Sequence, residues 1–251
     1  MRLLALLCLF AVNILTATED KVVIWKMDDV RAGEKRRLQA GFKRLAEWAQ
    51  AEKTVVTMGV ICDSFALPNA DDVAWIKANA LENGGVVEFW HHGWDHRSWT
   101  EAGKPQWEFR GPDAATQAKH LKDACDIFRR ATGLTFHAFG APFNQADDAT
   151  IAAMDAVPEL TIWMYPPKNE TKRRVLGRSL NIEPATGKVS YALFAQEYAA
   201  KKPTGMMLLQ GHCGMWSDDS FHDFVKIAAL LKQDGWTTMT SAQYVEKTAK
   251  K

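Results

Sequence analysis

Apolar residues recur along the chain at two spacings, which alternate from one segment to the next. Short runs rich in β-branched and aromatic residues are typical of buried strands. They predict strands over residues 22–27, 54–61, 86–90, 135–139, 160–165, 206–210 and 236–240, with a further candidate within 175–182. Apolar residues three or four positions apart predict helices over 34–52, 71–82, 113–132, 147–155, 193–201 and 219–233. Helix ends are expected at Asn69, at Gly133 and at Ser241, the cap of a short terminal helix.

The repeated order of strand and helix predicts a parallel sheet with helices outside it. An α/β barrel and an open doubly wound sheet both fit this order. Polar, chemically active residues follow at least four of the predicted strands: Asp28–Asp29, His92, Phe143–Asn144 and His212. In a barrel these strand ends meet at one face, whereas an open sheet would scatter some of them. The pattern therefore favours an α/β barrel.

The N-terminus has the pattern of an export signal. Arg2 precedes an apolar run over 3–15, and Ala17 offers a small residue for cleavage before a polar stretch. The run is short for a membrane span, and a buried N-terminal strand or helix is the alternative. We expect a signal peptide over 1–17 and a single domain over 18–251. The processed protein would be periplasmic or secreted, with no membrane attachment.

Composition limits the function classes further. The chain of 251 residues is 47% hydrophobic and 24% charged, as in an ordinary globular domain. Its formal net charge of +1 argues against nucleic acid as a partner, and nothing in the sequence indicates an oligomeric state. Beyond the expected signal, Cys62, Cys125 and Cys213 are too few and too widely spaced for a disulfide framework. Buried, unpaired thiols are the simpler interpretation.

Asp28 and Asp29 place two carboxylates at the end of an apolar strand, where they are costly unless paired or bound to a cation. Successive side chains on a strand point to opposite faces. One carboxylate would therefore bind a metal while the other faces a substrate from a different angle. A helix cap or a salt bridge in a loop is the alternative.

Three of the seven histidines lie within residues 91–96. His92 and His96 are four positions apart, which allows two imidazoles to meet one metal ion. Together with a carboxylate they suit zinc, and also cobalt, nickel or iron. Asp95 or another acid would orient a ligand ring. For this histidine cluster, a polar surface loop is the alternative.

His212 directly follows a hydrophobic strand, where it would be placed for proton transfer. A histidine packed in the core is the alternative for His212.

Taken in order, these motifs resemble those of the polysaccharide deacetylases with a NodB homology domain, carbohydrate esterase family four. The matching residues are Asp28–Asp29, His92 to His96, Ala141–Pro142–Phe143 and Leu209 to His212. The resemblance covers about residues 22 to 245 and is greatest to a divergent branch whose second motif reads His-Gly-aromatic-x-His. It implies a deformed (β/α)7-type barrel and one divalent metal ion.

The resemblance also implies a role for each matched residue. Asp29, His92 and His96 would bind the metal, and Asp28 would be the general base. The Phe143 backbone N–H would stabilise the oxyanion, and His212 would protonate the leaving group.

This chain departs from the family pattern at two places. Gly140 stands where the family usually has an arginine that tunes the base. The acid and tryptophan of the fourth motif are also missing, with Trp163 as the one candidate for the latter.

Ten tryptophans are present, and several follow the catalytic motifs. Trp94 and Trp216 are candidates for lining a sugar-binding cleft because indole faces pack on sugar C–H groups, and Asn144 is a further substrate-binding candidate.

The leading functional hypothesis is a metal-dependent enzyme that removes acetyl groups from a sugar or polysaccharide. The same site acting on another glycan bond or an amide is one alternative, motivated by Gly140. A carbohydrate-binding protein without turnover and a structural domain with an incidental metal are the others.

Overall fold

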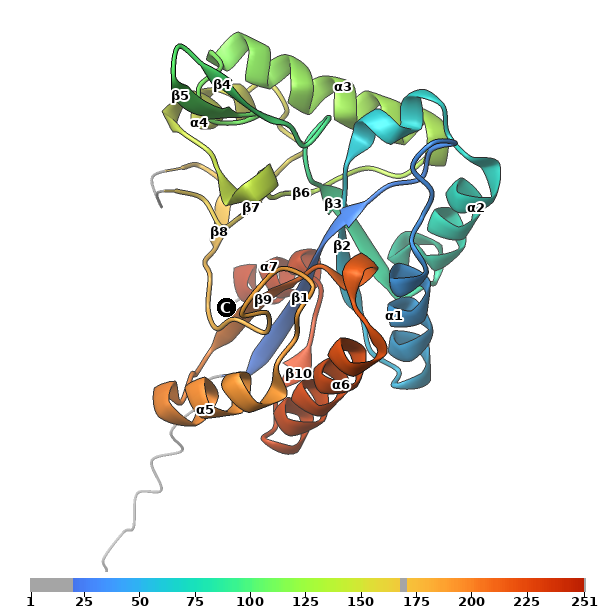
Figure 1. Cartoon of the computed structure of the whole chain (residues 1–251), viewed down its shortest axis with the longest axis vertical. Helices are drawn as coiled ribbons and strands as arrows, with labels where there is room; N and C mark the ends of the chain where they lie inside the picture. Colours follow the sequence, from blue (N-terminus) through green and yellow to red (C-terminus); the bar gives the residue numbers. More distant parts are fainter. Residues whose placement is uncertain (1–19, 168–170, 251) are drawn as a thin grey trace, which may run out of the picture.

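The computed structural model describes residues 20–167 and 171–250 (Figure 1). The expected signal peptide lies outside the described residues. Among the helices of the described part, none is both long and apolar enough to cross a membrane.

The main sheet is built from parallel strands. Its order is β9 (Met206–Gly211), β1 (Val22–Val30), β2 (Val56–Val60), β3 (Val87–His91), β6 (Ala138–Phe139), β7 (Ile162–Met164) and β8 (Arg174–Leu176). An additional short strand, β10 (Thr237–Thr238), pairs with the beginning of β1. All these pairings are parallel.

The sheet curves into a barrel that lacks ladder pairing between β8 and β9. Side chains bridge this opening instead. The Ser179 hydroxyl accepts a hydrogen bond from the Leu208 N–H, and the Tyr165 hydroxyl donates one to the Leu208 carbonyl. The predicted deformed (β/α)7-type barrel is confirmed in this form.

Helices surround the sheet (Figure 1). They are α1 (Ala40–Ala51), α2 (Ala70–Asn79), α3 (Ala114–Thr132), α4 (Asp148–Met154), α5 (Tyr191–Lys201), α6 (Asp218–Gln233) and α7 (Ser241–Ala249). Short 3₁₀ turns follow three strands, as η1 (Cys62–Ala66), η3 (Pro142–Asn144) and η4 (Cys213–Met215), and another, η2 (Leu81–Asn83), follows α2. As predicted, Asn69 caps α2 and Gly133 ends α3 in a left-handed conformation.

Several predicted boundaries were wrong because tertiary contacts override local propensity. The first helix begins at Ala40 rather than Glu34, since the preceding backbone bonds elsewhere: the Glu34 N–H to the Leu67 carbonyl and the Leu38 N–H to Asp72. The second helix ends at Asn79, where Ala80 is extended. The strand expected over 135–139 is reduced to β6, and the region 175–182 contains only the end of β8.

A hairpin was not predicted. It consists of β4 (Ser98–Glu101) and β5 (Lys104–Trp107), which pair antiparallel between the histidine motif and α3. The cap of α7 is Thr240 rather than Ser241, because Thr240 and Gln243 form a reciprocal capping box.

Alternation along the strands separates two buried regions. On β1, Val23, Trp25 and Met27 pack in the core beneath the helices, whereas Val22 and Ile24 belong to a second cluster. This second cluster includes residues of β3, β6, β7, β8 and β9, so it fills the barrel interior. Cys62, Cys125 and Cys213 are buried and unpaired, as predicted.

The inward face of β3 connects the two ends of the barrel. Trp90 fills the middle, with its ring packed where Gly59 lacks a side chain. Glu88 lies two residues before Trp90 on the same face of β3. It accepts hydrogen bonds from the Ser241 N–H, the Ser241 hydroxyl and the Ala242 N–H at the start of α7. His92 follows β3 at the opposite end.

Burial of Glu88 generates a pH prediction. Burial raises the pKa of Glu88 to about 7 from its ordinary value of 4.5, although the hydrogen bonds from Ser241 and Ala242 oppose this. The folded state therefore holds a proton that the unfolded state releases between these values, so stability falls as pH rises through this window. We expect wild type to lose roughly 3 kcal/mol more than Glu88→Gln over this range in urea unfolding. Parallel pH profiles for the two proteins would contradict this assignment.

Candidate metal centre

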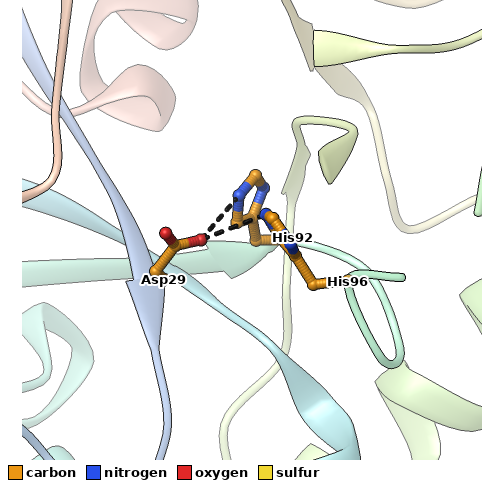
Figure 2. A group of neighbouring side chains, drawn as sticks. All are labelled: Asp29, His92 and His96. Carbon is orange, nitrogen blue, oxygen red and sulfur yellow. Dashed lines mark ion pairs between the residues drawn. The ribbon is translucent and has the colours of Figure 1, made fainter. Parts of the chain in front are cut away.

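Three predicted ligands meet at the C-terminal end of the barrel strands (Figure 2). Asp29 lies near the end of β1, His92 directly follows β3, and His96 lies in the next loop. Asp29 Oδ1 is 3.3 Å from His92 Nε2 and 3.2 Å from His96 Nε2. The structure thus brings the three predicted ligands together, and their role in metal binding stays a prediction.

The chemistry of these atoms fits a cation. His92 Nδ1 lies 2.7 Å from the Gly140 carbonyl, which only accepts, so Nδ1 carries the proton. The Nε2 lone pair then faces Asp29 Oδ1, which is buried without a hydrogen bond. Burial and the neighbouring His92 lower the pKa of His96 to about 4, so His96 is neutral near pH 7. The His92 Nε2 lone pair and Asp29 Oδ1 therefore face each other as two acceptors, an arrangement that a divalent ion satisfies.

The end of β1 departs from strand alternation. Asp29 has a φ of 79°, and the pairing with β2 shifts register between Met27 and Val30. Asp28 and Asp29 therefore both approach His92, with Asp28 Oδ2 3.6 Å and Asp29 Oδ1 3.3 Å from Nε2. The expectation that the two carboxylates point to opposite faces was wrong, because a left-handed residue interrupts the pleat.

Asp28 is held by a buried cation that sequence reasoning missed. Lys26 Nζ donates to both Asp28 oxygens at 2.7 Å, and neither side chain is more than 2% exposed. The Gln210 amide donates to Asp28 Oδ2 at 2.6 Å. Burial lowers the pKa of Lys26, while the charge of Asp28 acts in the opposite direction.

Gly140 provides the space that Lys26 occupies. A Cβ atom at Gly140 would lie 3.2 Å from Lys26 Cε and 2.8 Å from the Trp90 ring. Lys26 Nζ also lies 4.6 Å from the centre of the Trp90 ring. Lys26 thus accompanies Asp28 although Gly140 stands where the resemblance leads us to expect an arginine. The spacing of Lys26 and Asp28, two positions apart on one strand, was a sequence signal for this contact.

His212 is anchored by Glu183, a second residue that the sequence did not indicate. His212 Nδ1 donates to Glu183 Oε2 at 2.7 Å, and the His212 N–H donates to Oε1 at 2.8 Å. Burial alone would lower the pKa of His212, but Glu183 and the charge of Asp28 outweigh it and raise that pKa. Glu183 follows an irregular segment, where no periodic pattern distinguishes it from a surface acid.

The tryptophan candidates are half-buried. Trp216 donates its indole N–H to Glu183 Oε1 at 2.5 Å and packs on Phe224. Trp94 packs against the core with the rest of its side chain partly accessible. Trp163, the candidate for the fourth motif, is fully buried against Phe139 and takes no part in the site. A role of Trp94 and Trp216 in substrate binding stays a prediction.

The Ala141–Pro142–Phe143 segment reaches the ligands through its aromatic ring. Phe143 is 45% exposed, and its ring centre lies 4.3 Å from that of His96. Phe143 and Asn144 both adopt positive φ, at 56° and 54°. The Asn144 amide donates to Gln210 Oε1, and Asn144 Oδ1 is buried without a hydrogen bond. Such strained residues cluster at functional sites.

No family model and no curated protein matches this sequence. Solved structures do match its fold. The acetyl xylan esterase of family 4 from Clostridium thermocellum, in complex with a cobalt ion, has a TM-score of 0.61 at 13% identity and covers 91% of this chain and 92% of its own. The peptidoglycan deacetylase PdaC from Bacillus subtilis has a TM-score of 0.59 at 14% identity, with 92% and 93% covered.

BA3943 from Bacillus anthracis, described as a CE4 family pseudoenzyme, is equally similar. Its TM-score is 0.60 at 10% identity, and the match covers 90% of this chain and 65% of that one. At such low identity these likenesses define the fold, which is the NodB-like barrel of carbohydrate esterase family 4. The fold implied by the four sequence motifs is therefore confirmed, and active and inactive proteins share it.

The buried ion pair gives a stability prediction. Lys26→Met leaves the Asp28 carboxylate buried without its cation, so we expect unfolding free energy to fall by about 3 to 5 kcal/mol. Lys21→Met is the matched control, because Lys21 directly precedes β1 and its ammonium donates to the Asp234 carbonyl and faces the Trp236 ring, with no buried carboxylate as partner in the described part of the chain. It should change stability by less than about 0.5 kcal/mol. Equal urea midpoints for both variants would mean that Gln210 alone satisfies Asp28.

Proposed function

We propose that this protein is a metal-dependent hydrolase that removes N- or O-linked acetyl groups from a sugar or polysaccharide. The observation that carries the proposal is the meeting of Asp29, His92 and His96 beside two proton-transfer candidates, Asp28 and His212. The fold shared with an acetyl xylan esterase and a peptidoglycan deacetylase supports it.

Asp29, His92 and His96 would hold one divalent ion, with zinc as the first choice and cobalt, nickel or iron as alternatives. Bound there, the ion supplies positive charge that polarises an acyl oxygen and lowers the pKa of a nearby water. The cobalt ion in the esterase from Clostridium thermocellum supports a divalent metal in this fold.

The residues of the chain would divide the proton transfers. Asp28 takes a proton from the attacking water, while Lys26 and Gln210 orient its carboxylate. His212 donates a proton to the departing amine or alcohol from its Nε2, because its Nδ1 proton is engaged by Glu183. The Phe143 backbone N–H is the proposed donor to the developing oxyanion.

Substrate binding would involve the aromatic residues around these groups. Phe143, Trp94 and Trp216 offer apolar surface to a sugar ring, and Asn144 offers a buried amide oxygen without a hydrogen bond. We further propose that residues 1–17 are an export signal, so that the processed protein acts outside the cytoplasm.

The first experiment measures metal content and acetate release together. Wild type should bind about one metal ion per chain and release acetate from an acetylated sugar, and His92→Ala should lose both because only two ligands remain. The substrates are acetylated xylan, peptidoglycan and small N- and O-acetylated sugars. Absence of metal after incubation with zinc or cobalt would exclude the proposed centre.

A binding protein without turnover is the second candidate, because the pseudoenzyme BA3943 shares the fold. Asp28→Asn separates the two, since it removes the base and leaves the three ligands. An enzyme loses acetate release by about 10²-fold or more in this variant while keeping its metal. A binder instead shows no acetate release in wild type and retains glycan affinity.

The contact between Glu183 and His212 gives a pH prediction. Glu183 raises the pKa of His212, and the protonated form is the one that donates. In Glu183→Gln that pKa is lower, so the alkaline limb of kcat/KM should move to lower pH. His222→Gln, at an exposed histidine on α6, is the control and should leave the profile unchanged. If the alkaline limb of kcat/KM lies at the same pH in Glu183→Gln as in wild type, His212 is not the general acid.

A further inference from the structure

Glu108 is a buried acid that the proposed reaction does not use. It follows the β4–β5 hairpin and is 1% exposed, although a carboxylate at this depth requires several hydrogen bonds. Its partners lie in the loop that carries His96.

Three consecutive backbone N–H groups of that loop donate to the Glu108 carboxylate. Trp94 N lies 2.5 Å from Oε1, and Asp95 N and His96 N lie 3.3 and 2.8 Å from Oε2. The preceding Gly93 N–H donates to His91 Nδ1. Successive N–H groups that converge in this way form a concave anion site, which the Glu108 carboxylate fills.

The backbone of the loop adopts this shape only with support. Gly93 has a φ of 88° and His96 a φ of 55°, a region that residues with a side chain rarely adopt. A Cβ atom at Gly93 would lie 2.6 Å from Glu108 Oε2, so the carboxylate packs directly on the glycine. His92 lacks this dependence, since β3 and the Gly140 carbonyl hold it.

Glu108 is itself fixed from two sides. His120 on α3 donates its Nδ1 proton to Glu108 Oε1 at 3.2 Å. The Glu108 N–H donates to the Arg97 carbonyl, which ties the hairpin to the end of the loop. The hairpin and α3 together therefore determine where the carboxylate lies.

We propose that Glu108 is a positioning residue that places His96 for metal binding by filling the concave anion site of residues 94–96. The inference rests on the proposed metal centre. It holds that Glu108, which is not a metal ligand, determines the position of one ligand, His96. Asp95, Glu108 and His120 also lie close enough to one another to be considered as ligands. The Glu108 oxygens already accept hydrogen bonds from three N–H groups and from His120. We therefore infer that they hold the loop in place rather than bind a metal.

The test measures metal affinity in a double-mutant cycle. Glu108→Gln keeps the size of the side chain but turns an amide toward N–H donors, so zinc and cobalt Kd values should rise about 10- to 100-fold. His96→Ala should weaken binding at least as much. Adding Glu108→Gln to His96→Ala should then have little further effect, because Glu108 acts through His96. The absorption of bound cobalt should change in the same direction in both single variants.

Glu88→Gln is the matched control. Glu88 is likewise a buried acid that accepts backbone N–H groups, but at the opposite end of the barrel. It should leave the zinc and cobalt Kd values unchanged. If Glu108→Gln does not fold, His120→Ala is the second variant, because it removes one hydrogen-bond partner of Glu108. It should raise the metal Kd by a smaller factor than Glu108→Gln. This increase should be absent when His120→Ala is combined with His96→Ala.

The outcomes are separable. Wild type that binds no metal would overturn the proposed function itself. Wild type that binds metal while Glu108→Gln binds it equally well, or losses that add fully in the double variant, would overturn the positioning role alone. Two metal ions per chain, one of them lost in His120→Ala, would instead identify Asp95, Glu108 and His120 as a second site.

Discussion

The constraint on which the site depends is the burial of charge inside the barrel. Lys26 and Asp28 lie on the inward face of β1, where neither is tolerated alone. Pairing them lets a carboxylate reach the end of the barrel interior, within 3.6 Å of His92. Gly140 and Trp90 complete the arrangement, one by leaving space for the lysine and the other by packing along it. The apolar side chains that fill the barrel are therefore in direct contact with the polar residues of the site.

The same logic repeats around the strand ends. Four of the proton-transfer and ligand candidates have a buried partner that fixes their orientation: Lys26 for Asp28, the Gly140 carbonyl for His92, Glu183 for His212, and Glu108 for the loop of His96. Positive φ values at Asp29, His96, Phe143 and Asn144 show that the backbone bends where these groups converge. The regular sheet carries such strain because its ladders are undisturbed below the site.

Sequence reasoning was most successful where the information is local. Apolar runs located the main strands, and the dense histidine motif indicated two of the three side chains that meet at the candidate metal centre. It failed where a distant partner decides the outcome. Hydrogen bonds from Arg37 and Leu38 to Asp72 delay the first helix, and the roles of Glu183 and Glu108 become visible only from side-chain contacts that no periodic pattern reports. The contact of Lys26 with Asp28 could have been predicted from the sequence, because the two residues share one face of a strand.

The three unpaired thiols bear on how the fold responds to redox conditions. Cys62, Cys125 and Cys213 are buried, and burial raises the pKa of each, which suppresses the reactive thiolate. Within the described residues the fold is held together without a covalent crosslink. Its integrity is thus independent of the ambient redox potential.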